Sequence, residues 1–481
     1  MINRILIRIK VVQMLYSYLL TQTDFRIDAQ PQGLSNDNKF AHAVYLDLLL
    51  LMLEISGTSA IHGQPCAVSV TDPKLSKKLT EGKLAKALAG DPLVQRIMLD
   101  GKTDIASLRG VAQHLHDTIV GSEVYNTYKR KKGPRKLADE VQMWTVVVET
   151  ILAKDPVLDQ ALRQLDGYSN VGFRRAINQL SSTLNSYFAS SESYIKACDD
   201  LQTSLDKAYQ LYVSLFVLIL ELTREQERRI ETAKAKHLAT AADLNPNMRF
   251  VNNALAQRLA QCPSLESYLN DNKDEAVGWE TDVVLINKLL ADITASQLYA
   301  DYMASPAGDY EADCEFWREV MRSIIFPSDA LAEALEDKSV YWNDDLPIMG
   351  TFVLKTLRQA ATNPGDDVCL LPKYKDDEDA RFGAELFQDA VRNHEEYRAS
   401  LIDTFIDVEQ WDPERLAFMD IVILTTAISE LINYPNIPVA VTINEYIEIA
   451  NSYSSPKSGQ FVNGILFNVV NKLRQDGVIT K

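Results

Sequence analysis

Cysteine is scarce in this sequence. Its five cysteines are scattered singly, at Cys66, Cys198, Cys262, Cys314 and Cys369. No two of them stand at the C-x-x-C spacing of a zinc ribbon or a redox motif. An odd number of isolated cysteines favours a reduced compartment over a disulfide framework, so we expect a cytoplasmic protein.

Long apolar runs are also missing. The most apolar stretch, VSLFVLILEL at 213–222, is too short to cross a bilayer. The first residues are not expected to form a signal peptide, because Arg4, Arg8 and Lys10 interrupt the apolar region that such a peptide needs. We therefore expect no membrane partner.

The usual signals of catalysis are incomplete. The GKT at 101–103 lacks the upstream glycine of a phosphate-binding loop, and no G-x-G occurs to mark a nucleotide-binding strand and helix. His114 and His116 lie two residues apart, which does not place them on one helical face, and no cysteine or carboxylate set stands at metal-ligand spacing. The sequence predicts no enzyme, no cofactor, no metal site and no small-molecule substrate.

Basic residues are too few to balance the acidic ones. The chain has 66 Asp and Glu against 49 Lys and Arg, a net charge of -17. Because phosphate affinity comes from clustered Lys and Arg, any RNA site must be local. The densest basic stretch is YKRKKGPRK at 128–136, with Lys129, Arg130, Lys131, Lys132, Arg135 and Lys136. It is a candidate secondary RNA patch, and the alternative interpretation is a solvated loop.

Helical periodicity dominates, and strand-like alternation is nearly absent, so the fold should be all-α. The chain also repeats itself. A shift of about 170 residues lays YLDLLLLMLEI (45–55) over YVSLFVLILEL (212–222), and HDTIVGSEVYNTY (116–128) over ADITASQLYADY (291–302). We interpret this order as a tandem duplication.

A fainter third similarity follows the two copies. WNDDLPIMGTFVLKT (342–356) resembles WDPERLAFMDIVILTT (411–426), and polar, turn-forming linkers at 28–39 and 363–383 bracket the duplicated region. We expect four parts: a first helix at 1–26, helical repeat module one at 40–187, helical repeat module two at 205–361, and a C-terminal domain at 382–481.

The C-terminal residues carry clear helix signals. Thr442 and Glu445 fit a capping box, and Ser458 fits the N-cap of a last helix. The apolar stripe of that helix holds Phe461, Ile465, Val469 and Leu473. A helix start surrounded by a lysine, hydroxyls and amides can hold phosphate and hydrogen-bond a base edge. The alternative is that Phe461 is a core residue and Asn463 an ordinary polar surface residue.

These residues carry a resemblance. INEYIEIANSYSSPKSGQFVNGIL (443–466) resembles the signature of the NusB family, and RIKVVQMLYSY (8–18) resembles that family's first helix. The resemblance covers about 1–26 and 382–481. It implies a NusB-like helical bundle, formed by the N-terminal helix and the C-terminal hundred or so residues, into which the two tandem modules are inserted.

The resemblance also implies a function. NusB proteins are bacterial transcription antitermination factors that bind boxA RNA of the ribosomal leader together with the small-subunit ribosomal protein known as NusE. RNA polymerase and other Nus factors are further partners of that machinery. The alternative for this chain is a helical protein-interaction scaffold in transcription or ribosome assembly, with a vestigial RNA site.

Carried to matching positions, the resemblance implies one small RNA site built from both ends of the chain. Its residues would be Arg4, Arg8, Lys457, Ser458, Gln460, Phe461 and Asn463. The chain departs from the family pattern at Ile9, where Glu is usual, at Thr425, where Arg is usual, and at Asn451, where Lys is usual. Basic character is therefore reduced around the implied site.

Overall fold

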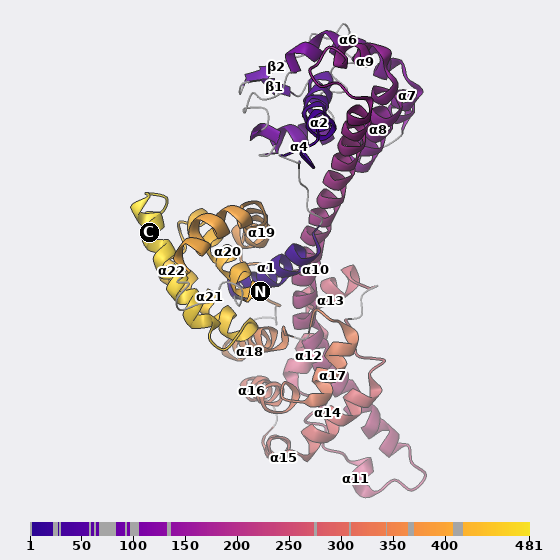
Figure 1. The fold of residues 1–481 in the computed structure, drawn as a ribbon. Helices are drawn as coiled ribbons and strands as arrows, with labels where there is room; N and C mark the ends of the chain where they lie inside the picture. The colour runs from indigo at the N-terminus through magenta and orange to yellow at the C-terminus, as the bar shows by residue number, and fades with distance from the viewer. Residues whose placement is uncertain are drawn as a thin grey trace. The chain divides into compact units, whose positions relative to one another are not determined.

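The fold is all-α, as predicted (Figure 1). The computed structural model describes residues 2–22, 27, 30–56, 59–61, 64–66, 83–91, 94–96, 105–131, 136–273, 277–306, 309–342, 344–363, 370–406 and 417–481. Within these ranges the only strands are β1 (Ser59–Ile61) and β2 (Gln64–Cys66), which form one antiparallel pair. None of the helices in these ranges is both long and apolar enough to span a membrane.

The chain divides into two compact units. Unit 1 contains Met1–Leu19 and Ala197–Lys481, and unit 2 contains Leu20–Lys196. The division falls inside the longest helix, α10 (Asn170–Lys234), whose first part belongs to unit 2 and whose remainder belongs to unit 1. The finer boundaries between the modules stay a prediction.

Unit 2 is a helical domain with its own core. Its other helices are α2 (Asn36–Ile55), α4 (Lys83–Gly90), α6 (Ile105–Gly121), α7 (Glu123–Arg130), α8 (Leu137–Thr150), the short η1 (Leu152–Lys154) and α9 (Pro156–Leu162). Helix α2 packs on α6, and side chains of α8, α9 and the start of α10 complete the core, with Trp144 buried among them.

Unit 1 holds the remaining helices. They are α1 (Arg4–Thr21), α11 (Ala241–Leu244), α12 (Ala254–Ala260), α13 (Pro263–Asp271), α14 (Val283–Ala295), α15 (Gln297–Ala304), α16 (Tyr310–Val320), η2 (Met321–Ile325), α17 (Asp329–Lys338), α18 (Leu346–Thr362), α19 (Asp377–Tyr397), η3 (Arg398–Ile402), η4 (Asp403–Phe405), α20 (Phe418–Asn433), α21 (Val439–Tyr453) and α22 (Ser458–Gln475). Helix α16 packs on α18, and α20 packs on α19, α21 and α22.

The two copies seen in the sequence hold the same buried hydrogen bond at matched places. The hydroxyl of Tyr45 lies 2.9 Å from that of Thr183, and the hydroxyl of Tyr212 lies 2.8 Å from that of Thr356. The N-caps of α7 and α15, Ser122 and Ser296, also correspond in the repeat. A duplication would place them in this way.

Helix α1 is buried on most sides. Leu6, Ile7, Val11 and Leu15 are fully or almost fully buried, whereas Ile5 faces solvent. Its neighbours include α19, because a Cβ added at Gly383 would lie 2.9 Å from a methyl group of Ile7. This close approach places the N-terminal helix against elements far downstream in the sequence.

Two predicted helix caps are wrong. Helix α21 begins at Val439 after Pro438, so Thr442 lies inside the helix and forms no capping box with Glu445. Helix α22 has Lys457 at its N-cap, and Ser458 is its first helical residue. In both cases the hydroxyl makes a hydrogen bond to a distant carboxylate instead of capping its own helix.

Candidate nucleic-acid interface

Arg8, predicted as an RNA contact, is buried in an ion pair. Its Nε donates to Oε2 of Glu430 at 2.7 Å and its Nη2 donates to Oε1 at 2.9 Å. Arg8 is only 3% exposed, and Glu430 is fully buried. Burial works against the charged guanidinium, but the hydrogen bonds and charge of Glu430 outweigh it and raise the pKa of Arg8. This guanidinium is therefore directed at α20 and not at solvent.

Two hydroxyls complete the surroundings of Glu430. Thr442 donates to Oε1 at 2.8 Å, and Tyr446 donates to Oε2 at 3.3 Å. Burial, together with the negative charge of Glu430, raises the pKa of Tyr446 well above its usual value, so its hydroxyl keeps its proton. The buried carboxylate thus accepts four hydrogen bonds, which offset the cost of removing it from water.

Arg4 is partly exposed but is also paired. Its Nε donates to Asp379 at 2.7 Å, and its Nη2 donates to Glu378 at 2.8 Å. The ring of Phe382 lies 5.0 Å from the guanidinium carbon of Arg4 and 5.7 Å from that of Arg8. The arginines of α1 thus bind α19 and α20, and RNA would have to compete with Asp379 and Glu378 for Arg4.

The start of α22 is held by a carboxylate from α20. Oδ2 of Asp420 accepts from Ser458 at 2.9 Å, and Oδ1 accepts from Ser454 at 2.6 Å. Ser458 also accepts from the backbone N–H of Ser455 at 3.1 Å. Ser458 is buried, so it positions the loop before α22 and does not face a ligand.

The remaining predicted residues of α22 divide between core and surface. Phe461 is 4% exposed and belongs to the core, together with Ile465, as its apolar stripe predicts. Lys457, Gln460 and Asn463 are exposed along the first turns of the helix. These three side chains are the part of the predicted site that solvent can reach.

The close contact between α21 and α22 explains one departure from the family pattern. A Cβ added at Gly459 would lie 2.1 Å from Oδ1 of Asn451, so the asparagine covers the first turn of α22 where a glycine leaves room for it. The other departure with a visible partner is Thr425, whose hydroxyl lies 3.1 Å from Nδ1 of His394. Thr425 is therefore a fully buried residue in place of a basic one, whereas Asn451 remains exposed beside the first turn of α22.

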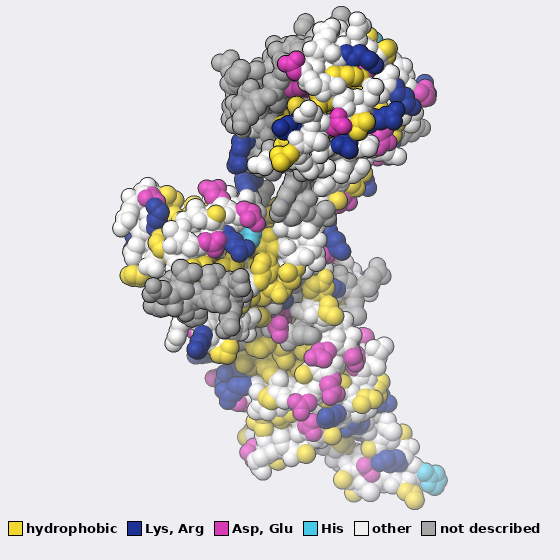
Figure 2. Space-filling model, in the orientation of Figure 1, with side chains coloured by type: hydrophobic (Ala, Val, Ile, Leu, Met, Phe, Trp, Pro, Cys, Tyr) yellow, Lys and Arg dark blue, Asp and Glu magenta, His cyan; other side chains and the backbone are white. Residues whose placement is uncertain are grey.

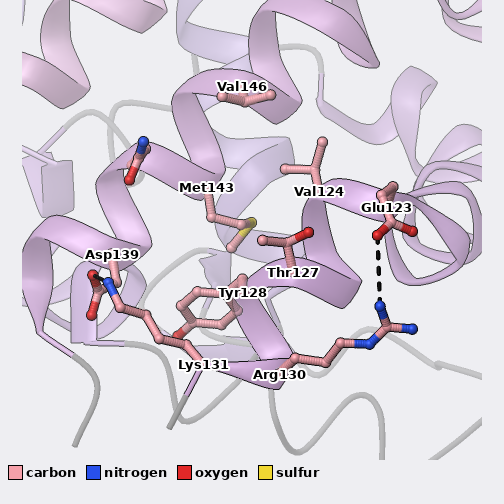
Figure 3. Close-up of a pocket in the computed structure, with 10 residues that line it drawn as sticks. Glu123, Val124, Thr127, Tyr128, Arg130, Lys131, Asp139, Met143 and Val146 are labelled. Carbon is pink, nitrogen blue, oxygen red and sulfur yellow. Dashed lines mark hydrogen bonds and ion pairs between the residues drawn. The ribbon is translucent and has the colours of Figure 1, made fainter. Parts of the chain in front are cut away.

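The predicted secondary patch lies beside a groove in unit 2. The groove has a volume of about 770 Å³ and separates α7 from α8 (Figure 3). Val124, Tyr128 and Met143 lie between two ion pairs, Arg130 with Glu123 at 3.7 Å and Lys131 with Asp139. The hydrogen bond from Lys131 lowers the pKa of Asp139.

Charge at this patch is therefore mixed. Basic and acidic side chains stand side by side over α7 and α8 (Figure 2). Lys129 and Lys136 are also exposed, whereas Lys132 and Arg135 lie outside the residues that the structure describes. The described part of the patch is a groove with both signs of charge at its rim.

In module two, an aromatic ring occupies the place that corresponds to Met143. Phe316 stands one position before Trp317, as Met143 stands one position before Trp144. The ring of Phe316 stacks on Tyr302 with 3.9 Å between ring centroids. In module one, the flexible Met143 side chain lines the groove beside Tyr128 instead.

The histidines named in the sequence have structural partners. His114 Nε2 lies 2.8 Å from Asp155, and His116 Nδ1 lies 3.2 Å from Asp117. No group of three or more metal-ligating side chains occurs in the part of the chain that the structure describes.

Comparison with known proteins places these helices in a family. The model of the NusB family matches residues 313–471, which begin in α16 and end in α22. The transcription antitermination protein NusB of Salinibacter ruber is 31% identical over 135 residues, which are 27% of this chain and 82% of that protein. The chain belongs to the NusB family.

Other NusB proteins match over shorter stretches. The protein of Koribacter versatilis is 42% identical over 94 residues, which are 19% of this chain and 61% of that protein. The protein of Dictyoglomus thermophilum is 40% identical over 82 residues, which are 17% of this chain and 56% of that protein. The chain thus spans less than two thirds of these two relatives, and it is much longer than NusB proteins generally. No solved structure matches it.

Sequence reasoning missed the acidic partners of this NusB-like bundle. Glu430 and Asp420 were not singled out, although each is a carboxylate next to the apolar run of α20. A buried carboxylate needs a partner, so its place among apolar residues could have predicted an ion pair or hydrogen bonds. The identity of that partner depends on the fold.

Proposed function

We propose that this chain is a transcription antitermination factor that binds boxA-like ribosomal leader RNA together with the ribosomal protein NusE. The observation that carries the proposal is its alignment with proteins named transcription antitermination protein NusB, at 31% to 42% identity. RNA polymerase and other Nus factors are the further partners in this proposal. It requires no enzymatic activity, no cofactor and no small-molecule substrate.

The exposed start of α22 is the RNA contact in this proposal. Lys457 supplies a phosphate contact, and the amides of Gln460 and Asn463 hydrogen-bond base edges. Arg8, Ser458 and Phe461 act as positioning residues, because each is buried against the bundle. Arg4 contributes its charge at the edge of the site while it remains paired with Asp379.

The test is RNA binding measured across a range of salt concentrations. Lys457→Ala should weaken binding of boxA and scrambled RNA alike, and should reduce the slope of log affinity against log salt by about 1, as loss of one phosphate contact does. Lys472→Ala is the matched control, because Lys472 lies at the other end of α22 and pairs with Asp476. The proposal fails if the unaltered protein, with or without NusE, binds boxA and scrambled RNA equally at every salt concentration.

The groove of unit 2 favours a second candidate function, a protein-interaction scaffold. Its floor is apolar and its rim pairs Arg130 with Glu123 and Lys131 with Asp139, a mixture better suited to a protein than to RNA. Met143→Lys should abolish binding of purified RNA polymerase while RNA affinity stays unchanged. If Lys129→Ala and Lys136→Ala instead lower RNA affinity, the patch is the secondary RNA contact predicted from its charge.

A further inference from the structure

Helix α22 has one face that no other element covers in the described structure. Its buried side, which includes Val462, Leu466 and Val470, packs on α20 and α21. On the opposite side Gln460, Asn463, Gly464, Phe467 and Asn468 are exposed. Residues three, four and seven positions apart lie on the same side of a helix, so Gln460, Gly464 and Phe467 follow one another along this face.

Phe467 is an unusual residue to find in solvent. It is 62% exposed, and it is the only exposed Phe, Tyr or Trp among the residues that the structure describes. Its position lies off the apolar stripe that holds Phe461 and Ile465 in the core. Core packing therefore does not explain the ring.

Gly464 leaves open space one turn before this ring. A Cβ added there would meet no atom within 4 Å, so no neighbouring side chain or backbone requires a glycine. Glycine weakens the interior of a helix relative to alanine. What it provides here is a flat strip of backbone beside Phe467, on which a planar group can lie.

The charge of the helix favours an anionic ligand. Residues 458–475 contain no Asp or Glu, in a chain with 66 acidic residues, and Lys457 precedes them. The exposed amides of Gln460 and Asn463 carry both donors and acceptors, as base edges do. An aromatic ring, an open glycine and amides without a nearby carboxylate on the same helix suit a single-stranded nucleic acid.

We propose that Phe467 and Gly464 form a stacking platform for one unpaired RNA base, next to the amides of Gln460 and Asn463. This inference rests on the proposed RNA-binding function and extends its site one to two turns further along α22. A single bound base would account both for the solvent-exposed ring of Phe467 and for the glycine at 464, which has no packing neighbours. A duplex would not bind in this way, because its bases are already stacked on one another.

The experiment uses the full chain and a short fluorescein-labelled single-stranded RNA that contains a boxA-like sequence, with the same RNA annealed into a duplex as comparison. Phe467→Ala should raise the dissociation constant for the single strand about 10-fold or more, whereas Phe467→Trp should retain affinity. The salt dependence should stay as in the unaltered protein, because no phosphate contact is lost. Val478→Ala, which changes an exposed residue beyond the end of α22, should bind normally.

Gly464→Leu provides an independent variant that does not threaten the fold. Leucine favours the helix and enters open space, so the midpoint of urea unfolding should stay the same or rise while RNA affinity falls. If the unaltered protein binds the RNA but Phe467→Ala and Gly464→Leu bind equally well, the platform is disproved and the proposed function stands. If the unaltered protein binds no single-stranded RNA, both fail.

Sedimentation velocity separates RNA from a protein occupant of the same face. The unaltered protein and Phe467→Ala should sediment alike without RNA. A change in oligomeric state on substitution, with RNA affinity unchanged, would assign the face to self-association and overturn the inference.

Discussion

Arg8 and Glu430 form a buried two-hydrogen-bond ion pair between residues that are 422 positions apart in the chain. The pair joins α1 to α20, and Thr442 and Tyr446 of α21 donate to the same carboxylate. One carboxylate therefore connects three helices of the NusB-like bundle.

Removing either partner of this pair should strongly destabilise unit 1. Arg8→Ala leaves Glu430 charged and buried without its cation, which costs about 3–5 kcal/mol of unfolding free energy. Arg4→Ala is the control and should cost less than about 1 kcal/mol, because one of its partners, Glu378, is exposed. Urea unfolding measures both values. Equal losses for the two variants would contradict this account.

The Arg8→Ala variant also tests whether Arg8 contacts RNA directly or only stabilises the fold. Arg8→Ala should reduce RNA binding in proportion to the unfolded fraction, with an unchanged salt slope for the folded protein. A reduced slope at full folding would instead return Arg8 to the RNA-contact residues predicted from the sequence.

His394 should make stability depend on pH. Burial lowers the pKa of His394 below its usual value, and nearby Arg398 lowers it further while Glu395 opposes the shift. The unfolded chain then takes up a proton near pH 6.5 that the folded chain does not, so stability falls as pH drops below about 6.5. Each unit by which the folded pKa is depressed costs about 1.4 kcal/mol.

His394→Gln should remove this dependence. Unfolding free energies measured by urea titration between about pH 7 and pH 5 should fall for the unaltered protein and change less for the variant. An identical slope in the two proteins would show that other groups cause the acid sensitivity.

Substitution of the two matched tyrosines, Tyr45 and Tyr212, should lower the free energy of unfolding by different amounts. Tyr45→Phe removes the hydrogen bond to Thr183 and should cost about 1 kcal/mol. Tyr212→Phe also leaves the backbone N–H of Leu371 without the hydroxyl that accepts from it at 3.1 Å, so about 2 kcal/mol is expected. Hydrogen exchange of α2 amides and of α18 amides reports each unit separately. Equal costs would show that the Leu371 contact contributes little.

Unit 1 should still fold when unit 2 is deleted, but it should not fold when helical repeat module two (205–361) is deleted as well. Replacing residues 23–196 by a short Gly-Ser linker should leave unit 1 folded with a cooperative thermal transition. Deleting 27–372 would also remove Asp345, which pairs with buried Lys10 at 2.7 Å, and the α10 side chain of Leu205, which lies near Gly383. That shorter chain should melt without cooperativity. A sharp transition from it would mean that the NusB-like helices form a core alone.

Sequence patterns within one segment predicted the helices and their buried faces well, but they did not predict which side chains form hydrogen bonds with one another. The spacing of Phe461, Ile465, Val469 and Leu473 predicted a buried stripe, and all four side chains are buried. The hydroxyls of Ser458 and Thr442 fitted cap positions, yet each binds a carboxylate of α20. Such a choice depends on which helix lies alongside, and spacing within one segment carries no information about that.

Charge in the sequence was equally ambiguous. Arg4 and Arg8 matched a basic RNA-binding pattern, but Asp379 and Glu430 neutralise them in the fold. The platform residue Phe467 was missed for the opposite reason, because an isolated Phe in a helix is usually assigned to the core. Only its exposed fraction in the folded bundle distinguishes it.

The ion pair between α1 and α20 also affects how the protein is made. At about 5–20 residues per second, the ribosome adds Glu430 roughly 20 to 80 s after Arg8. During that interval the apolar surface of α1 has no complete downstream bundle to cover it, whereas unit 2, which ends at Lys196, is completed before Glu430 is added. Unit 1 must therefore fold late, and α1 is the segment that chaperones would have to protect during synthesis.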